Sequence, residues 1–479
     1  MENLFNTSNK KYGVLCPVFS LPGSFGIGDF SSCREFLDII TDSKLSLWQI
    51  LPLNITGYLD SPYQALSSFG GDEMYIDLDE LTSFYNIDFI LERFETDVYI
   101  DYLRVKTYKR RIIKDVYNLV KVTILDNSDY NDFLINNKDV VDTAKFLTLK
   151  ELNNLVSWVD FSVDYDDNNL QHKDLFNYHL FSQYTFDRQW KQIRKLASNK
   201  EITILGDLPF YVGHDSADVY FNKEIFWLED TRMIFKAGVP PDYFSSEGQL
   251  WGNPIYRWDI VKDNNYDYWI NRLNYSHKLY DVIRLDHFRG FDSYWMVDGN
   301  DDNAINGRWE RGPRDEFFNI LFDRLPDIKL VVEDLGIITE DVTSLRKKFS
   351  LLGMEVLQFS LDFEQENILE INDNSKVLYT GTHDNDTLFS YYLGLDPEQK
   401  KLLSDYFIKA GFHDDSITNM INLCIAQDVP LVVIPLSDLM YLENYARINT
   451  PATMGGTNWK FELSSFKDIE SGIKKFFSK

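Results

Sequence analysis

The chain has few cysteines and no long apolar run. Its 479 residues include three cysteines, Cys16, Cys33 and Cys424, and no CxxC pair. An odd number of widely spaced cysteines argues against a disulfide framework and is typical of buried thiols in a reducing compartment. The N-terminal segment MENLFNTSNKKYG lacks the apolar core of a signal peptide, and the longest apolar stretch, residues 429–436, is too short to cross a bilayer. We therefore expect a soluble, cytoplasmic protein.

Basic residues are also scarce. The chain carries 48 Lys and Arg against 75 Asp and Glu, for a formal net charge of −27. Nucleic acid backbones and anionic membrane surfaces are bound by clustered Lys and Arg, so we expect neither as a partner. A neutral or cationic ligand fits this composition better.

The motifs of several common enzyme classes are missing. The sequence has no GxxxxGK[ST] and no GxGxxG after a strand, which argues against a phosphate cradle for nucleotides. The seven histidines lack HExxH or other tight ligand spacing, so we expect no catalytic zinc or other metal site. No GxSxG motif is present, which argues against a serine hydrolase of the α/β class.

Eight short apolar or alternating runs do recur along the chain, and helical patterns such as 315–325 and 341–350 lie between most of them. Strands that alternate with helices predict a parallel sheet of βα units, and eight strands are the number that closes a (β/α)8 barrel. The runs are residues 12–16, 45–53, 201–210, 281–286, 329–336, 354–361, 376–381 and 429–436.

Two intervals are too long for a single helix and its loops. Residues 54–200 show helical patterning, for example at 101–120, and predict a largely helical insertion between the second and third strands. Residues 208–280 predict a second insertion. Its segment 237–259, AGVPPDYFSSEGQLWGNPIYRWD, is interpreted as a long functional loop, because its aromatic content argues against disorder. We expect 1–479 to form one catalytic barrel domain that carries both insertions.

The fourth predicted strand combines apolar and charged residues. With the period of two of a strand, Val282, Arg284 and Asp286 share one face, and Ile283 and Leu285 share the other. The apolar pair is expected to pack against the outer helices. Arg284 and Asp286 then point into the barrel, with Asp286 at the C-terminal rim, where barrel enzymes place their chemistry.

Acidic residues follow other predicted strands as well. Asp207 follows TILG, Glu333 and Asp334 follow LVV, and Asp384 comes after KVLYTG in the sequence THD. Barrel closure would bring these strand ends to one mouth. Several carboxylates there, with His383 among them, predict an acid/base site.

Each acid taken alone has a plainer explanation. An acid after a strand is often a helix N-cap, and Arg284 with Asp286 could be an ion pair that holds two strands in register. Recurrence at equivalent positions favours a shared site. Two such carboxylates are what glycoside chemistry requires, because one attacks the anomeric carbon while the other protonates the leaving oxygen and later deprotonates the acceptor.

Three loop clusters combine aromatic rings with amide and charged side chains, which is the composition of a sugar-binding groove. A single aromatic residue among them is more often a packing anchor, but the density of the clusters favours a groove. The clusters are Tyr58, Asp60, Ser61, Tyr63 and Gln64; Tyr243, Phe244, Gln249, Trp251, Asn253, Tyr256 and Trp258; and Arg447, Asn449, Asn458 and Trp459.

Together these motifs closely resemble the amylomaltases, also called 4-α-glucanotransferases or disproportionating enzymes, of the α-amylase superfamily. The resemblance runs nearly end to end and is weakest over 85–200. It implies a (β/α)8 TIM barrel with inserted subdomains and without the C-terminal β-domain of α-amylases. The matching stretches include SLPGSFGIGDF, WQILPLNITGYLDSPYQALSSFGG, GDLPFYVGHDSADV, AGVPPDYFSSEGQLWGNPIYRWD, VIRLDHFRGF, VEDLG, GMEVLQF, YTGTHDNDT and RINTPAT.

The resemblance also implies roles for individual residues. Asp286 corresponds to the nucleophile that forms a covalent glucosyl-enzyme, Glu333 to the general acid/base, and Asp384 to the third carboxylate. Arg284 resembles the arginine that orients the nucleophile and keeps it ionised. The segment 237–259 corresponds to the loop that covers the bound glucan in this family. The residues expected to contact substrate are Arg284, His383, Asp207, Tyr58, Asp60, Tyr243, Gln249, Trp251 and Asn458.

One departure from the family pattern is visible. Many relatives read GVLLHPTSLPG after the first strand, whereas this chain reads GVLCPVFSLPG, with Pro17 at the histidine position. The departure puts in doubt a substrate contact at that position and leaves the carboxylates intact.

The expected activity is transfer of an α-1,4-glucan segment between maltooligosaccharides by a retaining double displacement. A retaining α-glucan hydrolase is the first alternative, and a catalytically silent glucan-binding protein on the same barrel is the second. The partners are maltooligosaccharides and other α-1,4-glucans. No metal or organic cofactor is implied, because a carboxylate and protons suffice for the reaction.

Overall fold

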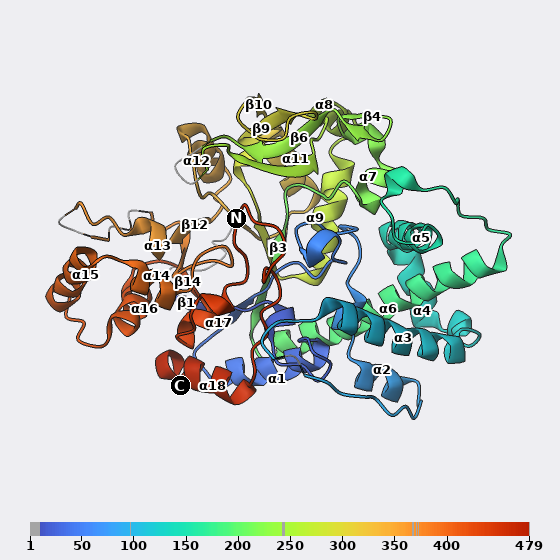
Figure 1. The fold of residues 1–479 in the computed structure, drawn as a ribbon, viewed down its shortest axis with the longest axis horizontal. Helices are drawn as coiled ribbons and strands as arrows, with labels where there is room; N and C mark the ends of the chain where they lie inside the picture. The colour runs from blue at the N-terminus through green and yellow to red at the C-terminus, as the bar shows by residue number, and fades with distance from the viewer. Residues whose placement is uncertain are drawn as a thin grey trace.

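The computed structural model describes residues 10–95, 97–241, 245–365, 368–369, 371 and 373–478, and is built around a parallel sheet of eight strands (Figure 1). Each strand overlaps one of the eight apolar runs of the sequence. The order of the strands is β11-β8-β3-β2-β1-β14-β13-β12. Their bounds are β1 (Lys11–Leu15), β2 (Leu47–Gln49), β3 (Thr203–Leu208), β8 (Val282–Leu285), β11 (Leu330–Val332), β12 (Gly353–Val356), β13 (Lys376–Tyr379) and β14 (Leu431–Pro435).

The sheet curls into a barrel whose two end strands, β11 and β12, meet at a narrow seam. These strands share one parallel bridge, between Val331 and Leu352, and the N–H of Val332 donates to the carbonyl of Leu352 at 2.8 Å. Every other neighbouring pair is in register over three to five residues. The predicted (β/α)8 barrel is therefore confirmed.

Alternation along the strands divides the core into two parts. Val282 belongs to the small cluster that fills the barrel, whereas Ile283 and Leu285 belong to the large cluster between the strands and the outer helices. The predicted facing of the fourth strand is confirmed. The cluster inside the barrel consists of Leu15, Leu47, Leu205, Val282, Val331, Met354, Val356, Val377, Tyr379, Leu431 and Val433.

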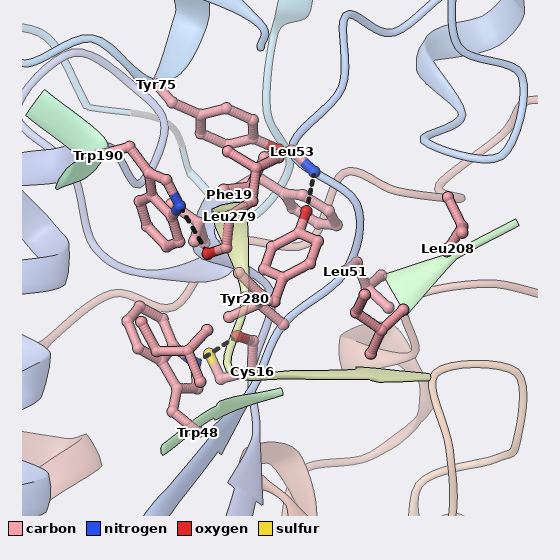
Figure 2. Packing of buried hydrophobic residues seen from close by; sticks show 14 of the residues in the cluster. Cys16, Phe19, Trp48, Leu51, Leu53, Tyr75, Trp190, Leu208, Leu279 and Tyr280 are labelled. Atoms are coloured by element: carbon pink, nitrogen blue, oxygen red, sulfur yellow. Dashed lines mark hydrogen bonds between the residues drawn. The ribbon is translucent and has the colours of Figure 1, made fainter. Parts of the chain in front are cut away.

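Aromatic side chains with satisfied polar atoms lock the outer core (Figure 2). The indole N–H of Trp48 donates to the carbonyl of Cys16 at 2.8 Å, and that of Trp190 donates to the carbonyl of Leu279 at 2.9 Å. The ring of Tyr280 lies directly against β3, where a Cβ on Gly206 would come within 2.1 Å of it. Only glycine allows this approach.

Residues 54–200 follow β2 and are mainly helical, and Figure 1 shows α3, α4 and α5 together on one side of the barrel. The last helix, α6, also serves the barrel, because its Trp190 packs on Phe30 of α1 (Phe30–Thr41) with the ring centroids 5.5 Å apart. The elements are η2 (Tyr58–Asp60), η3 (Glu73–Tyr75), α2 (Leu78–Phe84), α3 (Tyr102–Val120), η4 (Ile124–Asp126), α4 (Ser128–Asn136), α5 (Lys138–Leu152), η5 (Trp158–Asp160) and α6 (Leu170–Asn199).

The segment 237–259, interpreted from the sequence as a loop, contains strand structure. In its described part, 237–241 and 245–259, residues 237–239 belong to β6 and residues 249–254 form β7 of the antiparallel sheet β10-β9-β6-β7. The hairpin of β6 and β7 is joined to the sheet by pairing of β6 with β9, which comes after β8, and this remote pairing explains why the pattern of the segment did not show strands. The elements of this region are α7 (Ala217–Phe221), η6 (Lys223–Ile225), β4 (Leu228–Glu229), β5 (Arg232–Met233), β6 (Phe235–Val239), β7 (Gln249–Pro254), α8 (Trp258–Asp263), α9 (Asp267–Leu279), β9 (Ser293–Asp298) and β10 (Arg308–Arg311).

The remaining helices complete the outer layer, and α18 packs on α17 and α1. The run 354–361 is strand only as far as Val356, after which the chain turns into α13. No helix in the described part of the chain is long and apolar enough to span a membrane. The helices are η1 (Val18–Ser20), α10 (Arg289–Asp292), α11 (Arg314–Arg324), α12 (Glu340–Lys348), α13 (Leu357–Ser360), α14 (Leu388–Gly394), α15 (Pro397–Lys409), α16 (Ser416–Ala426), α17 (Leu436–Leu439), η7 (Asn444–Ala446) and α18 (Phe466–Phe477).

Candidate active site

The guanidinium of Arg284 joins two carboxylates at the C-terminal end of the barrel. One nitrogen, Nη1, donates to Asp207 Oδ2 at 2.6 Å, and Nη2 lies 3.0 Å from Asp286 Oδ1. Arg284 and Asp207 are buried, whereas the side chain of Asp286 is 26 % exposed. Burial acts to lower the pKa of Arg284, but the two carboxylates outweigh it and hold that pKa well above the usual value. Arg284 is therefore a permanent cation within the site.

Tyr63 connects Asp207 to His383, which lies after β13. Its hydroxyl donates to Asp207 Oδ2 at 2.5 Å and lies 3.0 Å from His383 Nε2. The Tyr63 and His383 rings stack with their centroids 5.4 Å apart. Burial raises the pKa of Tyr63 well above its usual value and lowers that of His383, so both side chains are neutral near pH 7.

Asp286 follows the last residue of β8, and its backbone N–H donates to the carbonyl of Leu208 at 3.1 Å. Burial raises the pKa of the Asp286 carboxyl to about 7, and the Arg284 charge opposes this rise. The carboxyl is therefore held by a cation on one side and reachable by solvent on the other.

Glu333 follows β11 and is held by two backbone donors. Its Oε2 accepts the N–H of His287 at 2.8 Å, and its Oε1 accepts the N–H of Leu335 at 3.0 Å. His287 has a φ of 47°, a left-handed conformation that is uncommon for residues other than glycine. The turn at His287 directs its backbone N–H toward the Glu333 carboxyl.

Glu333 and Asp286 compete for protons. Burial, followed by the negative charge of Asp286, raises the pKa of Glu333 to about 8. Asp286 is in direct contact with Arg284, so it ionises first and Glu333 keeps its proton. The two carboxyls therefore differ in the way that an acid and a nucleophile must differ.

Asp384 is held at the rim by the segment that follows η7. Asn449 Nδ2 donates to Asp384 Oδ1 at 2.6 Å, and Arg447 Nη2 donates to the Asp384 carbonyl at 2.5 Å. His383 Nε2 lies 3.3 Å from Asp384 Oδ2. The Asp384 side chain is 40 % exposed, so a ligand can reach it.

Strand β7 brings Gln249 and Trp251 to the same region. The Trp251 indole N–H donates to Gln249 Oε1 at 3.3 Å, and the Trp251 ring meets the His287 ring edge to face at 5.0 Å. Burial lowers the pKa of His287 to about 4 and keeps it neutral. Tyr243, the third residue predicted on this segment, lies outside the described residues.

Two of the other predicted substrate-contact residues, Asp60 and Asn458, have partners within the protein, whereas Tyr58 is exposed. Lys106 of α3 binds Asp60 Oδ1 at 2.6 Å, so this carboxylate anchors its own loop. Asn458 Oδ1 accepts the N–H of Thr450 at 3.1 Å, and its Nδ2 donates to Thr453 Oγ1 at 3.0 Å, so Asn458 closes the 450–458 loop. Tyr58 is 68 % exposed.

Two residues of the site were noted in the sequence only as members of aromatic and amide clusters. Tyr63 contacts Asp207 and His383, and Asn449 holds Asp384. No local pattern distinguishes either from its neighbours in SPYQ or RINT, because each partner lies more than 60 positions away in the sequence. In the described part of the chain, no three His, Cys, Asp or Glu side chains are grouped so that they could hold a metal ion.

The chain is similar to known proteins of one enzyme family. A family model described as 4-alpha-glucanotransferase matches residues 16–467. A 4-alpha-glucanotransferase of Streptococcus pneumoniae is 33% identical, covering 95% of this chain and 93% of the relative, and one of Clostridium butyricum is 35% identical, covering 93% and 94%. The structure of an amylomaltase from Streptococcus agalactiae in complex with acarbose has a TM-score of 0.89 at 31% identity and covers 98% of both chains. The chain belongs to the 4-α-glucanotransferase family and is an enzyme.

Proposed function

We propose that this enzyme moves a segment of an α-1,4-glucan from one maltooligosaccharide to another through a covalent intermediate on Asp286. The observation that carries the assignment is the fork of Arg284 between Asp207 and Asp286, with Glu333 raised in pKa nearby. The fork keeps the Asp286 carboxyl anionic in a buried site, while the Glu333 carboxyl stays protonated. A retaining reaction requires this pairing.

In the first step, an oxygen of Asp286 attacks the anomeric carbon of the donor glucan. The bond between that carbon and the glycosidic oxygen breaks, and Glu333 gives its proton to the leaving oxygen. The donor segment is then an ester of Asp286, and the shortened glucan leaves with its new hydroxyl.

In the second step, the 4-hydroxyl of another glucan displaces Asp286 from the anomeric carbon, and Glu333 takes the hydroxyl proton. The first step itself prepares Glu333 for this role. The negative charge of Asp286, which raises the pKa of Glu333, is absent while Asp286 is an ester. The pKa of Glu333 therefore falls when a base is needed and rises again when Asp286 is released.

Asp384 is proposed as the third carboxylate, which binds sugar hydroxyls and stabilises positive charge in the transition state. Its exposure leaves it accessible, and Asn449 fixes its orientation. Asp207 and Tyr63 act through Arg284 and His383, which surround the same position.

The proposed substrates are neutral maltooligosaccharides, in keeping with a net charge of −27 that repels anionic polymers. Gln249 and Trp251 on β7, together with Tyr243, are proposed to cover the bound glucan. A cytoplasmic location is proposed because Cys16, Cys33 and Cys424 are buried free thiols.

The variant Asp286→Asn tests the assignment. We expect transfer from maltotriose to fall by about 10⁴-fold or more, with maltotriose binding retained, because the amide preserves the shape and removes the nucleophile. Asp267→Asn, which changes an exposed carboxylate of α9 paired with Arg324 at 2.5 Å, is the matched control and should keep full activity. Near-normal turnover by Asp286→Asn would disprove the assignment. Wild-type products should include longer glucans, whereas reducing ends without longer products would identify a hydrolase.

A further inference from the structure

We propose that Asp334 and Arg346 position Glu333 by closing the barrel at the seam between β11 and β12, and so control proton transfer without touching the sugar. The inference rests on the proposed role of Glu333 as the general acid/base. It assigns a function to the second acid of VEDLG, which the mechanism does not use.

The seam has the least backbone pairing of any part of the barrel, and Glu333 directly follows β11, one of the two strands at the seam. Strands β11 and β12 share one bridge, Val331 to Leu352, whereas the other neighbours pair over three to five residues. The residue that carries the proton therefore follows a strand whose free edge has little backbone pairing.

The side chain of Asp334 continues the ladder where the backbone does not. Its Oδ1 accepts the N–H of Met354 at 2.7 Å, which is the bond that a strand carbonyl would otherwise accept. The residue is buried, and a Cβ on Gly353 would lie only 2.5 Å from Asp334 Oδ2. The glycine of GMEVLQF thus leaves room for this carboxylate.

Arg346 of α12 balances the buried charge and ties three segments together. Its Nε lies 3.1 Å from Asp334 Oδ2, an ion pair without hydrogen-bond geometry. Its Nη1 donates to the Ser375 carbonyl at 3.0 Å and to the Leu351 carbonyl at 3.2 Å, and Nη2 pairs with Asp373. Arg346 therefore joins the end of β11 to the starts of β12 and β13.

This closure reaches Glu333 through the backbone on both sides. The preceding residue, Val332, is bonded to Leu352, and the following residue, Asp334, is bonded to Met354. The next N–H, that of Leu335, is one of the two donors that hold the Glu333 carboxyl. Loss of the Asp334 charge that pairs with Arg346 therefore loosens the closure and displaces the Leu335 N–H, one of the two donors to the Glu333 carboxyl, while Asp286, on β8, keeps its contact with Arg284.

If Asp334 only stabilises the fold, its replacement lowers activity toward every substrate. If Asp334 positions Glu333, its replacement lowers activity only toward substrates whose cleavage needs a proton. Cleavage of maltotriose requires a proton on the leaving oxygen. Fluoride leaves from maltotriosyl fluoride without a proton, and azide attacks the glucosyl-enzyme without a base. Fluoride release in the presence of azide therefore needs Asp286 and does not need Glu333.

The experiment compares these two reactions in Asp334→Asn. We expect kcat/KM for maltotriose to fall about 100-fold and that for maltotriosyl fluoride with azide to stay within about threefold, because a small displacement of the acid affects only proton transfer. Asp29→Asn is the matched control, since Asp29 is an equally buried carboxylate paired with Lys109 at 2.6 Å. It should lower the melting temperature and leave the ratio of the two rates unchanged.

Arg346→Lys is the second variant, and it decides the test if Asp334→Asn does not fold. Selective loss of maltotriose activity in either folded variant supports the inference. Equal loss with both donors, or no loss with either, overturns it. Glu333→Gln tests the acid/base assignment separately, because it should show the same selective loss of maltotriose activity more strongly. If it does not, the acid/base assignment fails, whatever the result at Asp334.

Discussion

Replacing Arg284 with lysine keeps a positive charge in the barrel but removes the planar fork that joins two carboxylates. In the native site, Nη1 and Nη2 reach Asp207 and Asp286 at 2.6 and 3.0 Å. A lysine has one nitrogen on a flexible stem and does not reproduce this bidentate geometry. The Asp207 side chain is 0% exposed and Asp286 is 26% exposed, so an unpaired charge is costlier at Asp207. We expect the ammonium to pair with Asp207 and leave Asp286 without its partner.

The size of the effect follows from the lost contact. A hydrogen bond to a charged group contributes about 1.5–3 kcal/mol, which corresponds to roughly one to two pKa units. The pKa of Asp286, already raised by burial to about 7, then rises to or above the value of about 8 at Glu333. The proton moves from Glu333 to Asp286, which is the unproductive arrangement. The productive arrangement outweighs the other about 10-fold in the native site, and a shift of one to two pKa units lowers this ratio to between about 1 and 0.1, so the productive fraction falls by about 2- to 10-fold.

The assay is the pH dependence of kcat/KM for maltotriose disproportionation in native enzyme and Arg284→Lys. In the proposed mechanism activity requires ionised Asp286, so the acidic limb of the native profile should lie near pH 7 and move to higher pH in the variant. The maximum should fall by about 2- to 10-fold. A folded variant with an unmoved acidic limb and a maximum close to that of the native enzyme would refute the role given to Arg284.

Three further results are expected. Tyr63→Phe removes the hydroxyl that donates to Asp207 and should lower kcat/KM for maltotriose by about 10-fold, measured as glucose release. The pKa of Glu333 is higher in the folded enzyme than in the unfolded chain, so the folded state binds more protons and loses stability as pH rises from about 4 to about 8. Glu333→Gln should therefore raise the melting temperature, and by more at pH 8 than at pH 5. Lys106→Met removes the half-buried pair with Asp60 and should raise KM for maltotriose about threefold without changing kcat, as steady-state kinetics would show.

Local patterns in the sequence predicted the barrel and the strand ends that carry the candidate catalytic residues. Alternating apolar residues marked all eight strands, since each strand must bury one face inside the barrel and the other against helices. The same alternation placed Arg284 and Asp286 on the inner face. A wrong interpretation arose at 237–259, where β7 pairs with β6 and β6 in turn pairs with β9, which comes after β8. Strand pairing between distant segments leaves no period in either one.

Only the tertiary structure shows which groups the charged side chains contact. The sequence placed Arg284 beside Asp286, but the fold shows that Arg284 also binds Asp207, 77 positions away, and that Asn458 has partners within its own loop. A hydrogen bond depends on distances of about 3 Å and on direction, which are set when remote segments are packed together. Residue type and spacing therefore determined which groups this protein has for its chemistry, and barrel closure determined which of them meet.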